Sequence, residues 1–179
     1  MLAAAGVVFD VEKPGVDEAI AKRLFADPER IASELAAAKA LDVSKRRPKD
    51  WAIGSDSVVS VGGRRFDKPS DRSDAAEHLR FFSAKEMRLT SAVALALDGR
   101  VDWTHVETAR LNVRPLSDAF IDSYLDAEWP EVGYCAGVFR LEGRGVQLFD
   151  SIHGDYFSIL GMPLLPLLNA LRERGLTAV

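Results

Sequence analysis

The chain has 179 residues, which suits one domain, and we interpret residues 1–179 as a single domain. Its 47% hydrophobic and 28% charged residues are typical of a soluble globular protein, and no apolar run is long enough to span a membrane. A net charge of −4 argues against nonspecific nucleic-acid binding, and the single cysteine, Cys135, excludes an internal disulfide and favours a reducing cytoplasm.

The first third of the chain predicts one strand and one long helix. Val7 to Val11 is an apolar run typical of a strand, closed by the turn Lys13-Pro14-Gly15. Asp27 followed by Pro28 supplies an acidic N-cap and a first-turn proline, which predicts a helix start. Helical spacing is shown by the apolar positions Ile31, Leu35, Ala38 and Leu41. Residues 44–50 predict a polar basic loop.

The middle of the chain predicts strands and hairpins. Strands are expected at residues 51–53 and 58–61, on either side of a turn at Asp56. Gly62-Gly63 predicts a two-residue hairpin that returns through residues 64–66, and Asp98-Gly99 predicts another. The remaining elements expected here are a short helix at 73–82 and the two long strands 87–97 and 101–113.

The last third predicts two helices around one strand. Ser117 caps a helix that runs to about Ala127, residues 146–152 predict a strand, and a closing helix runs from Pro163 to Arg174. Because hairpins and crossover helices both occur, we predict an α/β fold with a mixed, curved β-sheet flanked by helices. Two lobes with a central cleft would bring residues of the two halves together.

Asp56 is the residue whose position most strongly suggests chemistry. An aspartate is unfavourable in a strand unless it caps a turn or acts chemically, and here it interrupts an apolar run. The alternative is an Asx turn, in which the carboxylate bonds its own backbone. The hairpin brings Lys68 back within reach, and an acid beside a cation suits hydrolysis of a charged phosphate substrate.

Two segments together resemble a known family. One is Gly54-Ser55-Asp56-Ser57 with Asp67-Lys68-Pro69, and the other is Cys135-Ala136-Gly137-Val138-Phe139-Arg140-Leu141-Glu142-Gly143. In combination they resemble the Maf (septum-formation) family of nucleoside triphosphate pyrophosphatases. The resemblance runs from Leu2 to the final helix and implies a Maf/ITPase-like fold.

The resemblance implies roles for five residues. Asp56 matches the family's proton acceptor for the attacking water, and Lys68 and Lys39 match lysines that stabilise phosphate charge. Asp17 and Glu18 match a Val-Asp-Glu motif and would hold Mg²⁺ or Mn²⁺. Without the resemblance, Lys68 is interpreted as a solvated loop residue. Lys39 is then a cation near a helix C-terminus, and Asp17 and Glu18 are surface residues or charges that complement a helix N-terminus.

Glu142 discriminates between subgroups of the family. The thymidine/uridine-triphosphate group reads Tyr-Gly-Ile-Gln-Gly, whereas the 7-methyl-GTP group reads Cys-Ala-Gly-Ser-Phe-Lys-x-Glu-Gly, which residues 135–143 resemble. A carboxylate accepts from the guanine N1–H and amine and favours a cationic methylated base. The alternative is a loop glutamate paired with Arg140 or Arg144. The resemblance assigns Ser57 as the second specificity residue.

Two segments depart from the 7-methyl-GTP pattern. Residues 153–163 are closer to the Gly-Asp-Tyr-x-Asn-Val-x-Gly-Leu-Pro pattern of the other Maf proteins. The family also opens with a strand and a Ser-x-Ser-x-x-Arg phosphate loop, and residues 2–9 match the helix end and second strand that come after this loop. The resemblance therefore implies a chain that lacks the opening strand, and we expect lower stability and activity than with it.

The resemblance predicts hydrolysis of nucleoside triphosphates, with modified nucleotides such as 7-methyl-GTP as substrates, to nucleoside monophosphate and pyrophosphate. The expected cofactor is Mg²⁺ or Mn²⁺, and the expected partner is the nucleotide, without nucleic acid or membrane; a homodimer is left open. One alternative is a catalytically impaired nucleotide-binding protein that regulates cell division. Another is a phosphatase of other substrates, which would release orthophosphate.

Overall fold

Five strands form one sheet in the computed structural model, which describes residues 1–177. The strand order is β2-β1-β3-β4-β5, and β1 pairs antiparallel with β2 as β4 does with β5. The strands are β1 (Ala52–Val61), β2 (Arg64–Phe66), β3 (Glu86–Leu97), β4 (Arg100–Val113) and β5 (Phe149–His153). The predicted α/β class with a sheet flanked by helices is confirmed.

The helices of the described residues include four that are at least ten residues long. The α-helices are α1 (Glu18–Leu24), α2 (Pro28–Arg46), α3 (Arg72–Phe82), α4 (Asp118–Glu128), α5 (Tyr156–Ile159) and α6 (Leu164–Glu173). The 3₁₀ helices are η1 (Ala3–Ala5), η2 (Glu131–Tyr134) and η3 (Arg144–Leu148). Within residues 1–177, no helix combines the length and the apolar character that crossing a membrane requires.

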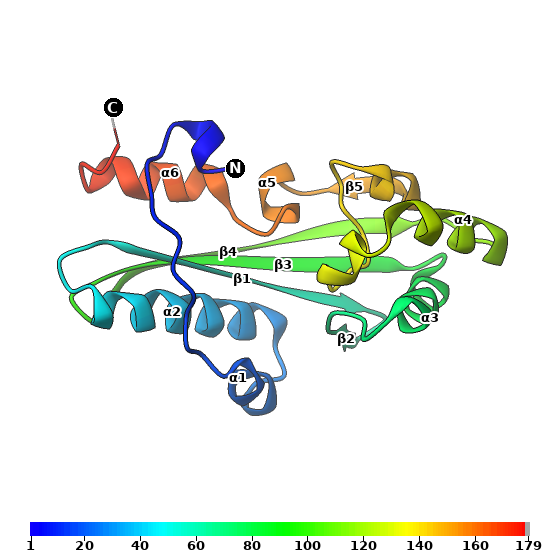
Figure 1. Cartoon of the computed structure of the whole chain (residues 1–179), viewed down its shortest axis with the longest axis horizontal. Helices are drawn as coiled ribbons and strands as arrows, with labels where there is room; N and C mark the ends of the chain where they lie inside the picture. The colour runs from blue at the N-terminus through cyan, green and yellow to red at the C-terminus, as the bar shows by residue number, and fades with distance from the viewer. Residues whose placement is uncertain (178–179) are drawn as a thin grey trace. The chain divides into compact units, whose positions relative to one another are not determined.

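Two compact units divide these elements. The first contains residues 1–57, 90–108 and 155–177, and the second contains residues 58–89 and 109–154. Strands β1, β3 and β4 each contribute residues to both units. Within the first unit, α2 and α6 cover opposite faces of the sheet (Figure 1).

Local signals set the ends of several elements. Asp27 accepts hydrogen bonds from the first-turn amides of α2, and Ser117 does the same for α4, so both predicted N-caps are confirmed. Both predicted hairpins form, because Gly62, Gly63, Asp98 and Gly99 all have positive φ angles, which the tight turn requires.

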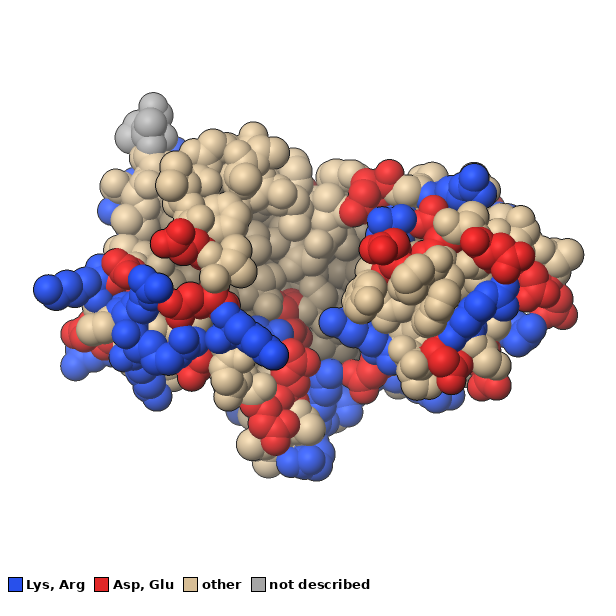
Figure 2. Space-filling view, in the orientation of Figure 1, with Lys and Arg blue, Asp and Glu red and all other residues tan. Residues whose placement is uncertain are grey.

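Helix α2 extends further than the sequence predicted. Residues 44–46, expected to be part of a basic loop, are helical, because the buried Ser44 hydroxyl accepts from the Gly99 amide at 2.9 Å. Arg46 and Arg47 then bind Glu12. Figure 2 shows the Lys and Arg side chains gathered at this end of α2.

The predicted strand at Val7–Val11 is wrong, because these residues join no ladder in the structure. Val8 is 97% exposed and Val11 is 86% exposed, whereas Val7 is partly buried and packs against the hydrophobic core. The ion pairs of Glu12 hold the end of this segment against α2. The strand predicted at 146–152 begins only at Phe149, since residues 144–148 form η3.

The predicted turn at Asp56 is also wrong. Strand β1 runs unbroken from Ala52 to Val61, so Asp56 lies inside a strand. The Asx-turn alternative is thereby excluded. The strand accommodates a carboxylate because a lysine from α2 reaches it, a contact between residues 17 positions apart.

Gly54 allows α2 to pack directly on β1. A Cβ at this position would lie 2.2 Å from the Ala36 carbonyl oxygen and 2.5 Å from the Ala40 amide nitrogen. Both neighbours are backbone atoms, so they cannot rotate away. On the opposite face of the sheet, a buried cluster joins α6 to β3; it comprises Leu2, Val93, Leu95, Leu164, Leu167, Ala170 and Leu171.

We predict that Gly54→Ala destabilises the protein by roughly 1–3 kcal/mol or more, because the added methyl group forces α2 away from β1. Urea unfolding midpoints measure the effect. Gly15→Ala is the matched control, because a Cβ there meets nothing closer than the Asp42 carboxylate at 3.9 Å. An unchanged midpoint for Gly54→Ala would show that the helix–strand contact is not tight.

Candidate functional site

Strand β1 presents different chemistry on its two faces. Side chains alternate along a strand, so Gly54 and Asp56 face α2, whereas Ser55 and Ser57 point to the other side. There Ser55 donates to the Gly161 carbonyl oxygen at 2.6 Å. The close packing at Gly54 thus places the α2 surface next to Asp56.

Lys39 of α2 joins two carboxylates. Its Nζ lies 2.5 Å from Asp56 Oδ1 and 2.7 Å from Glu18 Oε1 at the start of α1. The Asp56 side chain is 10% exposed and that of Lys39 is 19% exposed, so this pair is largely removed from water. The structure therefore brings together three of the residues that the sequence singled out.

Burial and pairing act in opposite directions on these groups. Burial raises the pKa of Asp56 above its ordinary value, although the hydrogen bond from Lys39 opposes this. For Lys39, burial alone would lower the pKa, but the bonds to Asp56 and Glu18 outweigh it and raise the pKa. The hydrogen bond from Lys39 lowers the pKa of Glu18. A buried carboxyl held by a cation has the character of a general base.

The carboxylates of this cluster differ in their fitness for a metal. Asp17 is the N-cap of α1 and accepts from the Ala19 amide at 3.0 Å, so that oxygen is committed to the helix. Asp56 and Glu18 converge on the Lys39 ammonium, so a cation already fills the position between them. Among residues 1–177, no group of three or more His, Cys, Asp or Glu side chains is arranged to hold a metal ion.

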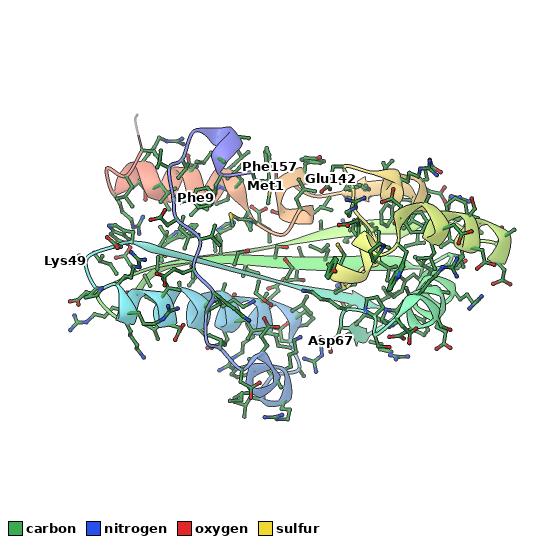
Figure 3. The ribbon with its side chains drawn as sticks, viewed as in Figure 1. Met1, Phe9, Lys49, Asp67, Glu142 and Phe157 are labelled. Carbon is green, nitrogen blue, oxygen red and sulfur yellow. The ribbon has the colours of Figure 1, made fainter. Side chains whose placement is uncertain are left out.

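Lys68 and Glu142 belong to the second unit, whereas Lys39, Asp56 and Ser57 belong to the first. Lys68 is exposed in the loop after β2, next to Asp67, which is labelled in Figure 3. Asp74 of α3 anchors this loop by accepting from the Ser70 amide at 2.9 Å.

Glu142 lies exposed in the loop between η2 and η3, where Figure 3 labels it. The neighbouring Arg140 donates instead to Glu128, the last residue of α4, at 3.0 Å. The same carboxylate accepts from the Arg144 amide at 3.4 Å. Glu128 therefore holds both sides of the turn that carries Glu142, and its side chain is only 7% exposed.

Tyr124 supports the loop at a second point. Val138 has a φ of 54°, an unusual value for a β-branched residue. The buried Tyr124 hydroxyl donates to its carbonyl oxygen at 3.0 Å. Burial also raises the pKa of Tyr124, so the hydroxyl keeps its proton and remains a donor.

The sequence did not point to several polar residues that matter here. Glu128 ends a helix, where a negative charge is unfavourable, and this was the available signal. Ser91 lies inside the apolar strand β3 and is fully buried. A polar residue within an otherwise apolar strand indicates a required partner.

Known proteins resemble this chain over most of its length. The Maf-like protein family model matches residues 1–174. A 7-methyl-GTP pyrophosphatase of Rhizobium etli is 47% identical, over 96% of this chain and 88% of that protein. One of Rhizobium meliloti is 44% identical, over 98% and 90%. A nucleoside triphosphate pyrophosphatase of Paramagnetospirillum magneticum is 44% identical, over 98% and 92%.

We predict that Lys39→Met lowers the free energy of unfolding by about 3 kcal/mol at pH 7, because it leaves Asp56 buried without a partner. The loss should shrink near pH 4. A carboxyl whose folded pKa is raised loses stability as the pH rises through that pKa, and removing Lys39 raises the pKa of Asp56 further. Lys39 also lowers the pKa of Glu18, and this stabilises the folded protein fully only at a pH above the ordinary pKa of a glutamate. Lys39→Met removes this stabilisation too, and the loss is larger at pH 7 than at pH 4.

Urea midpoints at both pH values measure this effect. The exposed Lys49→Met is the control and should change stability little at either pH. In Lys39→Met/Asp56→Asn, most of the pH dependence should disappear. Equal destabilisation at pH 4 and pH 7 would show that the effect comes from lost packing rather than from charge.

Proposed function

This chain belongs to the Maf-like protein family, and we propose that it hydrolyses nucleoside triphosphates to nucleoside monophosphate and pyrophosphate. It is then a hydrolase acting on acid anhydrides, as the names of its relatives indicate. The observation that carries the proposal is that Asp56, largely buried on an unbroken strand, binds Lys39, which also binds Glu18.

Asp56 is the general base in this proposal. Lys39 donates to Oδ1, and we assign the other carboxylate oxygen to the attacking water. The water oxygen bonds to the α-phosphorus while Asp56 takes its proton. The bond from the α-phosphorus to the bridging oxygen breaks, and pyrophosphate leaves with that oxygen. Packing of α2 on β1 fixes Asp56 in place, which favours one orientation of the water.

Two lysines neutralise charge in the proposal. The single positive charge of Lys39 offsets part of the charge of two carboxylates, so it also lowers the repulsion that a polyanionic substrate would meet at Asp56. Lys68 is exposed and has its charge available for a phosphate oxygen. Asp17 and Glu18 are the residues that would hold Mg²⁺ or Mn²⁺, through the carboxylate oxygens that bind neither the Ala19 amide nor Lys39. When bound, the cation supplies charge neutralisation on the phosphate oxygens.

Glu142 selects the base in this proposal, with 7-methyl-GTP as the preferred substrate. The relatives named 7-methyl-GTP pyrophosphatase support this choice. Glu128 binds Arg140, which leaves the exposed carboxylate of Glu142 able to accept from a guanine edge. Ser57 is the second specificity residue.

We predict that Asp56→Asn lowers turnover roughly 10²- to 10⁴-fold, because the amide keeps the size of the side chain but cannot take a proton from water. Pyrophosphate release from saturating substrate measures kcat. Asp42→Asn is the control, because this carboxylate of α2 accepts hydrogen bonds from the Gly15 amide and Arg46 and has no role in the proposed reaction. Turnover close to that of the wild type in Asp56→Asn would remove Asp56 as the base.

We further predict that Glu142→Gln reduces the preference for 7-methyl-GTP over UTP and dTTP by roughly tenfold or more, because the charge-assisted bond to the base is lost. The measured quantity is the ratio of kcat/KM values. Glu131→Gln, another exposed carboxylate of the second unit, should leave the ratio unchanged. Equal ratios in the wild type and Glu142→Gln would contradict the role of Glu142 as selector.

A further inference from the structure

Two serine hydroxyls and one backbone carbonyl form a chain of hydrogen bonds on the face of β1 opposite Asp56. This chain, called the hydroxyl file below, runs from Ser57 of β1 through Ser91 of β3 to Ser158 of α5. The Ser57 and Ser91 Oγ atoms are 2.7 Å apart, and Ser91 Oγ lies 2.7 Å from the Ser158 carbonyl oxygen. Ser91 and Ser158 are fully buried, and Ser57 is partly exposed. The three residues lie in the same unit.

The last member of the file fixes the direction of every proton in it. A carbonyl oxygen only accepts, so the Ser91 hydroxyl donates to Ser158. A hydroxyl has a single proton to donate. Ser91 therefore accepts from Ser57 in the other contact, although the distance between two hydroxyl oxygens cannot by itself distinguish donor from acceptor.

The Ser158 carbonyl is held rigidly, so the file has little freedom to reverse. Asp155 accepts from the Ser158 amide at 2.9 Å, and Glu107 of β4 accepts from the Ser158 hydroxyl at 2.5 Å. Reversing the Ser57–Ser91 bond would turn the Ser91 proton toward Ser57. The buried Ser158 carbonyl would then lose the Ser91 donor at 2.7 Å and keep only the Gly161 amide at 3.0 Å, which is unfavourable.

The other contact of Ser57 leads to the same conclusion. The Gly161 carbonyl oxygen accepts from Ser55 at 2.6 Å, whereas Ser57 Oγ lies 3.4 Å from it. The short contact with Ser91 takes the Ser57 proton in preference to this long one. Ser57 is left with lone pairs and no proton for a further partner.

We propose that Ser91 is a positioning residue that presents Ser57 to the substrate as a hydrogen-bond acceptor. Ser57 then recognises an N–H or O–H group of the nucleoside. It does not bind an ionised triphosphate oxygen, because both oxygens would be acceptors. This inference rests on the proposed function, which makes a nucleotide the substrate and Ser57 a specificity residue.

Nucleotide analogues that each lack one donor test the inference. The set consists of the 2′-deoxy, 3′-deoxy and inosine forms of guanosine triphosphate, with kcat/KM measured for the wild type and Ser57→Ala. For most analogues, Ser57→Ala should lower kcat/KM roughly three- to tenfold, the usual scale of one hydrogen bond. For the analogue that lacks the partner of Ser57, the substitution should cause no further loss.

Variants of the file separate positioning from stability. Ser91→Ala frees the Ser57 proton. In this background, Ser57→Ala should no longer spare the one analogue that lacks the Ser57 partner. The change should be in KM, whereas kcat should change little. Ser91→Thr keeps the hydroxyl and should restore the pattern. Thr90→Val is the matched control, because it removes a buried hydroxyl–hydroxyl bond of the same strand, between Thr90 and Thr108, without touching Ser57 or its partners. Thermal melting of each variant reports its stability.

Equal losses in Ser57→Ala for every analogue, together with altered losses when a phosphate oxygen is replaced by sulfur, would show that Ser57 donates to phosphate and would overturn the inference. Retention of the pattern in a folded Ser91→Ala variant would remove the role of Ser91. If the wild type releases no pyrophosphate, the proposed function fails instead. Calorimetric affinities for the same analogues then test Ser57 independently of turnover.

Discussion

The site depends on the direct packing of helix α2 against strand β1 at Gly54. Backbone atoms of Ala36 and Ala40 occupy the space that any Cβ at Gly54 would need. At this separation, Lys39 reaches Asp56, and the largely buried ion pair forms. A buried ion pair contributes little net stability compared with apolar residues of the same size. This small net contribution is one reason why we propose a chemical role for the pair.

The two faces of strand β1 carry different residues of the site, Asp56 on one face and Ser57 on the other. Asp56 faces a helix that supplies a cation, and the balance between burial and that cation sets its basicity. Ser57 faces a file of hydroxyls that ends on the rigid carbonyl of Ser158. Alternation along one strand thus places the proposed base and a proposed specificity residue next to each other in sequence while giving each its own surroundings.

Sequence motifs identified residues better than they identified conformations. Asp56, Lys39 and Glu18 were singled out, and the structure joins them through one ammonium. The same reasoning placed Asp56 in a turn, because an isolated carboxylate is unfavourable in a strand. Glu128, by contrast, carried no motif. Its importance comes from contacts with Arg140 and Arg144, which lie 12 and 16 positions away.

The sequence by itself determined the features that a few neighbouring residues encode: the N-caps at Asp27 and Ser117, the two hairpins and the α/β class. Only the tertiary structure decided that β1 is unbroken, that residues 7–11 form no strand, and in which direction the hydroxyl protons point. The physical reason is range. The hydrogen bonds of caps and turns form between residues a few positions apart, whereas the tertiary hydrogen bonds described here join residues from 12 to 106 positions apart.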